Sequence, residues 1–203
     1  VTTAEPKLKE RAHHAMLAHG ALVEAGVSRV EYYDFDRGLA GALADFDCVC
    51  LANGNPFYLL ERLRETGGDG VIEDLIEARR PVFACGAGAL LLGRTLRHVR
   101  SFDTSVSDLR CADATALGVL PYSLLLQANR WRARFGDYAE RLERSRRICG
   151  EMVELDDDEA LLIERGVTVL WLVLYKEGAL GLAAGLLRPG RVGRGERDRG
   201  HPS

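Results

Sequence analysis

The sequence has no hydrophobic run long enough to span a membrane and no strong excess of charge of either sign. Its most apolar stretch, residues 167–175, is much shorter than the roughly 20 residues that a transmembrane helix needs. The net charge of -3 and the pI near 6.0 provide no field that would draw the chain to nucleic acid or an anionic membrane. No stretch at its start resembles a signal peptide. We therefore expect a cytoplasmic protein without a nucleic-acid or membrane partner.

The sequence also lacks a cysteine framework. It contains five cysteines, an odd number, and no two pairs have the spacing of a zinc site. The acidic run Asp156-Asp157-Asp158 is the one local cluster of metal-ligand type, and consecutive carboxylates in a turn are more often solvated than metal-bound. We expect reduced thiols, no disulfide, no metal and no cofactor.

What the sequence does contain is an alternation of short apolar runs and amphipathic segments. Its 203 residues suit one α/β domain, which we assign to residues 1–187. Residues 1–4 are typical of the end of a strand, so an upstream first strand is one expectation. Residues 188–203 are rich in glycine and arginine without an apolar period, which predicts a disordered tail.

The predicted elements alternate through most of the chain. Helices are expected at 6–25, 39–44, 57–66, 71–78, 87–94 and 138–145, and strands at 27–33, 47–52, 81–85 and 117–120. Residues 152–155, 160–164 and 168–175 are expected to form antiparallel strands. This order predicts a three-layer α/β/α fold with a mostly parallel sheet and a C-terminal antiparallel hairpin.

The segment 83–92 has the pattern of a nucleophile elbow, a sharp turn between a strand and a helix that lifts one side chain above the sheet. Such a turn needs small residues on either side of its apex. Ala84 and Gly88 flank Gly86 in this way, and Ala87 follows the apex. The steric pattern is complete, but the apex residue is a glycine and carries no reactive group.

Three stretches in register resemble the peptidase E family, also called S51. Residues 53–60 (NGNPFYLL) are similar to its GGNTFxLL segment, residues 81–89 (PVFACGAGA) to its P-x-x-G-x-S-A-G-A elbow, and residues 117–122 (LGVLPY) to its LGLLPF stretch. The resemblance covers residues 2–181. It implies the class I glutamine amidotransferase-like, or flavodoxin-like, fold and the serine-type chemistry of aspartyl dipeptidases and cyanophycinases.

The departures from the family pattern fall at the positions that carry its chemistry. The resemblance places the serine nucleophile at Gly86 and the histidine base at Gln127, and no histidine lies between His98 and His201. It aligns the acidic member loosely with Asp103, with Asp108 second. It also implies binding positions at Gly54, Asn55 and Ala87, where backbone N–H groups would form the oxyanion hole.

These substitutions predict a catalytically inactive member of the family, because serine peptidases need a hydroxyl and a base. The remaining pocket would bind a small peptide, an anionic ligand or a protein partner. One alternative is an active hydrolase or amidotransferase-like enzyme that uses Cys85, although neighbouring strand residues alternate faces and Cys85 should point away from the apex. Another is a structural subunit that pairs with an active homologue, and a homodimer is a further option.

Other chemistry-bearing residues have a structural and a functional interpretation. His13, His14 and His19 lie in the predicted first helix and would reach the site only if that helix packed at the strand ends. His98 is nearest to the elbow in sequence and is a weaker catalytic candidate. Trp131, with Arg130, Arg132 and Arg134 around it, could bind a carboxylate or phosphate, but a helix face with one anchoring tryptophan is the more common arrangement.

Overall fold

The computed structural model describes residues 1–106, 113–165 and 168–173. Its main sheet has the strand order β1-β2-β6-β5, with β1 (Val49–Leu51), β2 (Val82–Ala84) and β6 (Thr168–Val173) parallel to one another. β5 (Ala160–Arg165) is antiparallel to β6, which confirms the predicted C-terminal hairpin. The tail predicted at residues 188–203 and the second acidic candidate, Asp108, lie outside the described residues.

A second parallel pair extends the fold beyond the main sheet. β3 (Ser123–Leu126) pairs in parallel with β4 (Met152–Leu155), whereas the sequence pattern favoured an antiparallel strand at 152–155. The strand expected at 117–120 does not form. Its backbone N–H groups instead donate to carbonyls at the end of the elbow helix: Leu117 to Leu91 at 2.9 Å and Leu120 to Leu92 at 2.8 Å. The apolar run is therefore used to hold a helix end.

The strand expected at 27–33 does not form either. The first residues of the chain lie beside β1, where the Val1 amino group donates to the Cys50 carbonyl at 2.6 Å and the Ala52 N–H donates to the Val1 carbonyl at 3.0 Å. The Tyr33 carbonyl accepts from the Thr2 N–H at 2.8 Å. Residues 1–2 therefore occupy the hydrogen-bonding edge of β1. Residues 27–33 do not pair with β1 and form no regular strand.

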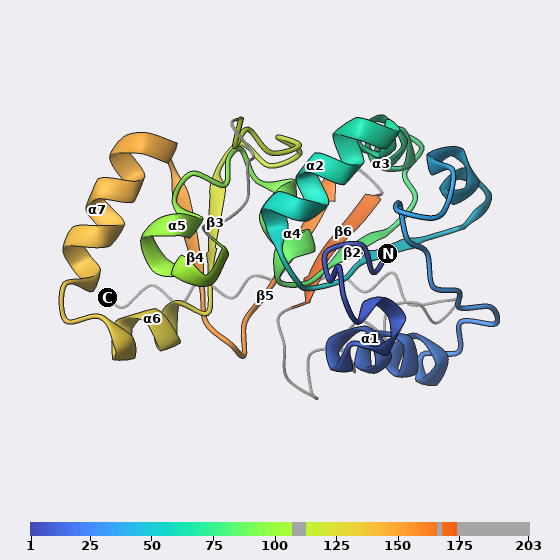
Figure 1. Cartoon of the computed structure of the whole chain (residues 1–203), viewed down its shortest axis with the longest axis horizontal. Helices are drawn as coiled ribbons and strands as arrows, with labels where there is room; N and C mark the ends of the chain where they lie inside the picture. The colour runs from blue at the N-terminus through green and yellow to red at the C-terminus, as the bar shows by residue number, and fades with distance from the viewer. Residues whose placement is uncertain (107–112, 166–167, 174–203) are drawn as a thin grey trace, which may run out of the picture.

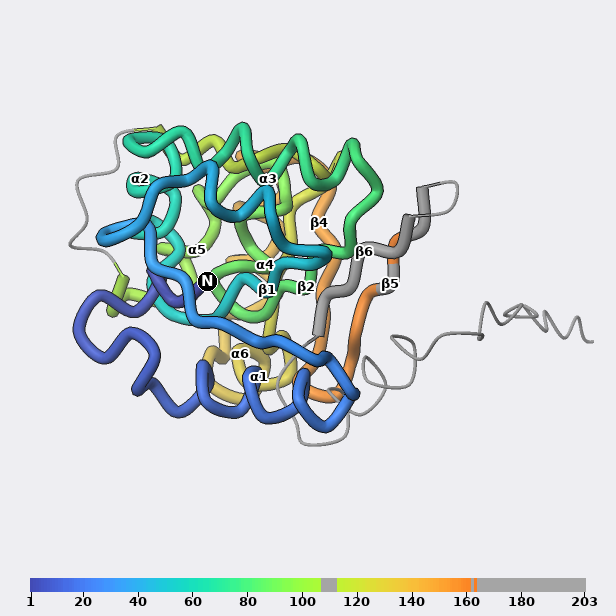
Figure 2. The backbone as a smooth tube through the Cα atoms, turned by 90° about the vertical axis from the view of Figure 1, so that its right-hand side faces the viewer, coloured from blue at the N-terminus to red at the C-terminus, as the bar shows by residue number. Residues whose placement is uncertain are grey.

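Helices lie on both sides of the main sheet, which gives the three layers that the sequence predicted. α1 (His13–Glu24) lies on the side of the strands opposite to α2 (Pro56–Thr66) and α3 (Gly68–Glu77), as Figures 1 and 2 show. The remaining helices are α4 (Ala87–Leu92), α5 (Val99–Phe102), α6 (Ala128–Arg134), α7 (Tyr138–Cys149) and the short η1 (Lys9–Arg11), η2 (Ala40–Asp45) and η3 (Thr104–Val106). No helix of the described residues is both long and apolar enough to cross a membrane.

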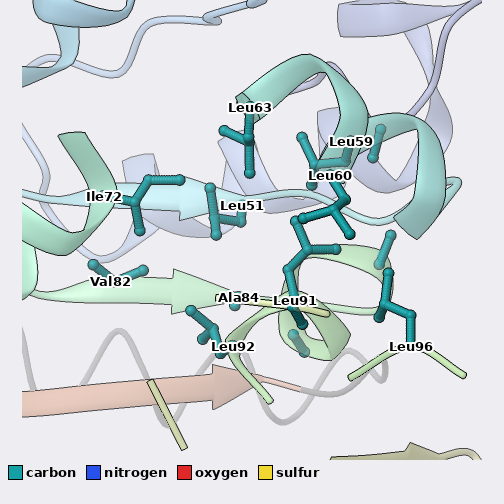
Figure 3. Packing of buried hydrophobic residues seen from close by; sticks show 14 of the residues in the cluster. Leu51, Leu59, Leu60, Leu63, Ile72, Val82, Ala84, Leu91, Leu92 and Leu96 are labelled. Carbon is teal, nitrogen blue, oxygen red and sulfur yellow. The ribbon is translucent and has the colours of Figure 1, made fainter. Parts of the chain in front are cut away.

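The core that positions the elbow lies between the strands and α2 and α4. Leu51 and Val82 from β1 and β2 belong to the same cluster as Leu60 from α2 and Leu91 from α4, and all four are fully buried (Figure 3). Full burial of such a side chain stabilises the fold by about 1.5–3 kcal/mol. This packing fixes the turn between β2 and α4 relative to the end of β1.

A second, polar feature joins the N-terminal segment to α2. The buried Lys9 ammonium donates to Asp34 at 3.0 Å and to Asp36, and Asp36 also accepts from Tyr58 at 2.9 Å and from Arg62 at 2.6 Å. Burial opposes the charges, but these partners hold the pKa of Lys9 above and the pKa of Asp36 below its ordinary value. We call these five residues the N-terminal ion cluster.

Candidate active site at the elbow

The elbow has the backbone geometry that its small residues predicted. β2 ends at Ala84, Gly86 has φ 51° and ψ -117°, and α4 begins at the next residue. A residue with a side chain is strained at this φ, so glycine suits the apex. A Cβ at Gly88 would lie 2.5 Å from the Cβ of Leu51, which explains the second small residue. The turn is thus a sterically complete elbow packed closely against β1.

The space above the apex is occupied by Asn53, which follows β1. The Ala87 N–H donates to the Asn53 Oδ1 at 3.0 Å. A Cβ built on Gly86 would overlap the Asn53 carboxamide and would lie 2.8 Å from the Asn53 Cβ. The Asn53 side chain therefore fills the volume that a side chain at residue 86 would occupy, and its oxygen accepts the hydrogen bond of the backbone N–H at the start of α4.

Sequence reasoning missed this role of Asn53, although a signal was available. The segment NGNP starts with asparagine at the position where the similar GGNT segment has glycine. In the structure the asparagine at 53 and the glycine at 86 fit together at one contact, because a Cβ at residue 86 would overlap the Asn53 side chain. Each of the two residues is visible in the sequence, but only the structure shows that they lie in contact.

The other binding positions near Asn53 differ from each other. Gly54 lines the cavity beside the elbow. Asn55 does not line it but caps α2, where its Oδ1 accepts from the N–H groups of Phe57 at 3.0 Å and Tyr58 at 3.3 Å. This is an ordinary N-cap, which satisfies helix N–H groups that lack a partner within the helix. In this structure Asn55 positions the helix rather than facing the cavity.

Gln127 lines the same cavity as Gly86, so the structure brings together the two positions that the resemblance singled out. Gln127 follows β3 and is the N-cap residue of α6, with a left-handed backbone at φ 58°. Its side chain is a neutral carboxamide, which accepts no proton near neutral pH. The end of β3 therefore presents hydrogen-bonding groups without a base.

Asp103 also lines the cavity, at the end of α5. Its Oδ1 accepts from the Ser105 N–H at 2.9 Å and from the Ser105 hydroxyl at 2.6 Å. The carboxylate therefore stabilises the turn into η3. It is placed at the cavity but is bonded to this turn rather than to an imidazole.

Cys85 faces away from the cavity, as strand alternation predicted. Its thiol is buried, does not line the cavity and lies 3.6 Å from the Leu51 carbonyl. A hydrogen bond with the Cys50 thiol, together with burial, raises the pKa of Cys85 well above its ordinary value. A protonated, buried thiol is a poor nucleophile, since the thiolate is the reactive species.

His98 is a buried wall of the cavity. Its Nε2 donates to the Leu124 carbonyl at 2.7 Å, and its Nδ1 lies 3.8 Å from the Cys149 Sγ. Burial lowers the pKa of His98 to about 4, which keeps the imidazole neutral at physiological pH. The ring is therefore held by protein groups and serves as a structural histidine.

The first helix approaches the site from the other side of the strand ends. His14 lies beside the backbone of Asn53, and burial lowers its pKa, but it does not line the cavity. His13 is exposed, and His19 stacks on Tyr32 with ring centroids 4.9 Å apart. The helix therefore contacts Asn53 through His14, but it supplies no base to the cavity.

Two basic residues of α6 form ion pairs with two residues of the acidic triplet. Arg130 donates to Asp157 at 2.5 Å, and Arg132 donates to Asp156 at 2.5 Å. Arg130, Arg132, Asp156 and Asp157 thus join α6 to the turn after β4. Within residues 1–106, 113–165 and 168–173, no group of three or more His, Cys, Asp or Glu side chains is arranged to hold a metal.

Comparison with known proteins supports the resemblance to the peptidase E family. The family model described as "Peptidase family S51" matches residues 13–170. Uncharacterized peptidases of Listeria monocytogenes and Listeria innocua are each 26% identical, over 41% and 45% of this chain; the chain spans 40% and 44% of their length.

A crystal structure of a candidate peptidase E protein from Listeria monocytogenes EGD-e has the same fold. It superposes with a TM-score of 0.64 at 20% identity, over 83% of this chain and 81% of that chain. The elbow, the order of strands and the extent of the family match agree with one another. On these grounds the chain belongs to peptidase family S51.

Proposed function

We propose that this protein is a catalytically inactive member of family S51 whose elbow cavity binds a small ligand. The observation that carries the proposal is the contact between Asn53 and Ala87, with glycine at the apex. A nucleophile, a base and free oxyanion donors are the three requirements of acyl transfer. At this elbow an asparagine side chain fills the place of the first and is bonded to one of the donors.

The remaining candidates do not restore the chemistry. Gln127 cannot take a proton from a nucleophile, and the His98 Nε2 is committed to the Leu124 carbonyl. The Cys85 thiol is buried outside the cavity. Loss of nucleophile and base together lowers turnover in a serine peptidase by about 10⁶-fold. We therefore expect no measurable hydrolysis by the family mechanism.

The test compares the unmodified protein with two designed revertants on aspartyl dipeptides. The double variant Gly86→Ser with Gln127→His restores the missing groups but keeps Asn53, whose side chain would overlap the Cβ of the introduced serine. The triple variant adds Asn53→Gly. We expect the unmodified protein and the double variant to be inactive. We expect the triple variant to hydrolyse the dipeptide and to react with a fluorophosphonate serine probe.

Hydrolysis by the unmodified protein would overturn the proposal, and loss of that activity in Cys85→Ala would assign it to the thiol. Equal probe labelling of the double and triple variants would show that Asn53 does not block the apex. Circular dichroism of all three proteins controls for folding, so that a missing signal can be traced to chemistry.

A further inference from the structure

The elbow cavity has a volume of about 190 Å³. An engineered cavity of about 150 Å³ holds benzene. The space therefore admits one six-membered ring with a small substituent and is too small for a typical drug-sized ligand, whose pockets start at about 300 Å³. The part of a ligand that this cavity encloses is therefore a single ring or a group of similar volume.

Most of the lining is apolar. The side chains that form it come from α2, α4, α5, β3 and α6, and include Pro56, Leu90, Val99, Phe102, Leu125 and Trp131. The Phe102 and Trp131 rings are tilted against each other with centroids 6.2 Å apart. Such walls favour an aromatic ring, which gains from apolar burial and from contacts with ring edges and faces.

The polar groups of the cavity are mainly neutral. Among the lining residues Asn53 and Gln127 carry carboxamides and Gly54 and Ala87 have polar atoms only in the backbone, and the Ala87 N–H is already bonded to Asn53. A carboxamide both donates and accepts hydrogen bonds, so it matches another uncharged amide group. These residues are suited to the polar end of an amide-bearing ligand.

The charge of the lining separates neutral ligands from anionic ones. Among the described residues that line the cavity, Asp103 is the only acid, and there is no lysine or arginine. His98 is neutral because burial lowers its pKa to about 4. A carboxylate entering this space would lose its hydration and face Asp103 without a cation to compensate it.

We infer that the cavity binds an uncharged aromatic amide and rejects the carboxylate of the same shape. This inference rests on the proposed function, because it takes Asn53 and Gln127 as ligand-binding groups at an inert elbow. It narrows the expected ligand from a small peptide or an anion to the neutral amide alone.

Benzamide and benzoate test the inference, since they have nearly the same size and differ in charge. Calorimetric titration of the full chain at pH 7 should give saturable binding of benzamide with a Kd of about 1 mM, and at least about tenfold weaker binding of benzoate. Asp103→Asn, which keeps an acceptor for Ser105, should narrow that difference by about threefold or more. The exposed Asp74→Asn on α3 is the matched control and should leave it unchanged.

A second pair of variants locates the binding site. Leu90→Trp places a large side chain in the cavity, and we expect it to abolish benzamide binding. Leu39→Trp makes the same change at a residue that is 85% exposed and should bind as the unmodified protein does. Heat denaturation of both variants shows whether each is folded.

Three results would overturn the inference: absence of saturable benzamide binding, benzoate binding as tight as benzamide, or unchanged binding in folded Leu90→Trp. If Leu90→Trp does not fold, competition between benzamide and toluene in the unmodified protein locates binding in the apolar cavity, and absence of competition overturns the inference. The dipeptide assay is independent of these results. Hydrolysis would defeat the proposed function, whereas inert protein that prefers benzoate would defeat only the ligand assignment.

Discussion

The N-terminal ion cluster and the elbow use polar groups in opposite ways, although α2 contributes to both. In the cluster, Asp34 and Asp36 each contact the Lys9 ammonium, and Asp36 also binds Arg62. At the elbow, Asp103 is the only acid of the described lining and it bonds to the turn at Ser105. Buried charge is thus present where it joins segments of the chain, whereas the described lining of the elbow cavity has one acid, which is only half-buried.

The difference teaches that the elbow backbone and its catalytic groups depend on separate contacts. Gly86 and Gly88 are required by backbone conformation and by the approach of Leu51, whatever side chains line the cavity. Asn53, Gly86 and Gln127 line the cavity, and of these Asn53 also accepts a hydrogen bond from the Ala87 N–H. In the N-terminal ion cluster the charged side chains themselves hold segments of the chain together, so the fold and these side chains depend on the same contacts.

The largest effect is expected from breaking the ion cluster. Lys9→Met leaves the buried Asp34 without its ammonium partner and removes one of the two cations of Asp36. Removing one member of a buried ion pair costs about 3–5 kcal/mol. The free energy of unfolding from urea titration should fall by this amount.

Lys7→Met is the control, because Lys7 is exposed two residues away. It should change the free energy of unfolding by less than about 0.5 kcal/mol. If Lys9→Met were as mild as the control, the cluster would not hold the N-terminal segment, and the contrast with the elbow would disappear.

An intermediate effect is expected at the elbow apex. Gly86→Ala introduces strain at φ 51° and overlaps Asn53, and should lower the free energy of unfolding by about 2–3 kcal/mol. Combining it with Asn53→Gly removes the overlap but not the strain. The double-mutant cycle, measured by urea titration, should therefore show a favourable coupling of about 1 kcal/mol or more.

The matched glycine is Gly20 in α1, where an added Cβ meets nothing within 4 Å. Gly20→Ala should stabilise the protein by about 0.5–1 kcal/mol, as expected for alanine in a helix. Additive effects of the changes at 53 and 86 would mean that these side chains do not compete for one volume.

The smallest effect is a pH dependence at the cavity wall. The pKa of His98 is lowered to about 4, below its ordinary value of 6.5, so the unfolded chain binds the proton more readily. The stabilisation is complete above pH 6.5 and is lost as the pH falls toward 4. Between pH 7 and pH 5 this amounts to about 2 kcal/mol, which urea titrations at both values should detect.

His98→Gln should make the stability less sensitive to pH over this interval, whatever its effect at pH 7. The exposed His13→Gln should keep the full dependence. An identical loss on acidification in His98→Gln and the unmodified protein would mean that the cavity wall is not a buried neutral imidazole.

Local features of the sequence predicted the elbow, because its small residues stand within one short segment between a strand and a helix. The small residues around Gly86 indicate a turn with no room for larger side chains. The alternation of side chains along β2 predicted that Cys85 points away from the apex, and Cys85 does not line the cavity. The antiparallel hairpin of β5 and β6 was also readable from two apolar runs separated by a short turn. The elbow and the hairpin are each formed by one continuous segment, although the contact of Gly88 with Leu51 joins residues that are distant in the chain.

The missed features depend on residues that are distant in the chain. Asn53 and Ala87 meet only because β1 and β2 end side by side, and no spacing rule joins them. The direction of β4 is likewise set by its pairing with β3, which an apolar run at 152–155 does not encode. Periodicity also could not show that residues 117–120 bond to a helix end rather than to a strand.

The hydrogen bonds between residues 117–120 and the end of α4 affect whether the elbow could form in another protein. α4 is short, and its final carbonyls, at Leu91 and Leu92, receive their hydrogen bonds from Leu117 and Leu120. The helix that carries the apex is therefore terminated by a segment outside its own strand–helix unit. Grafting the β2–α4 sequence onto another scaffold would transfer the residues of the turn without the brace that keeps them in place.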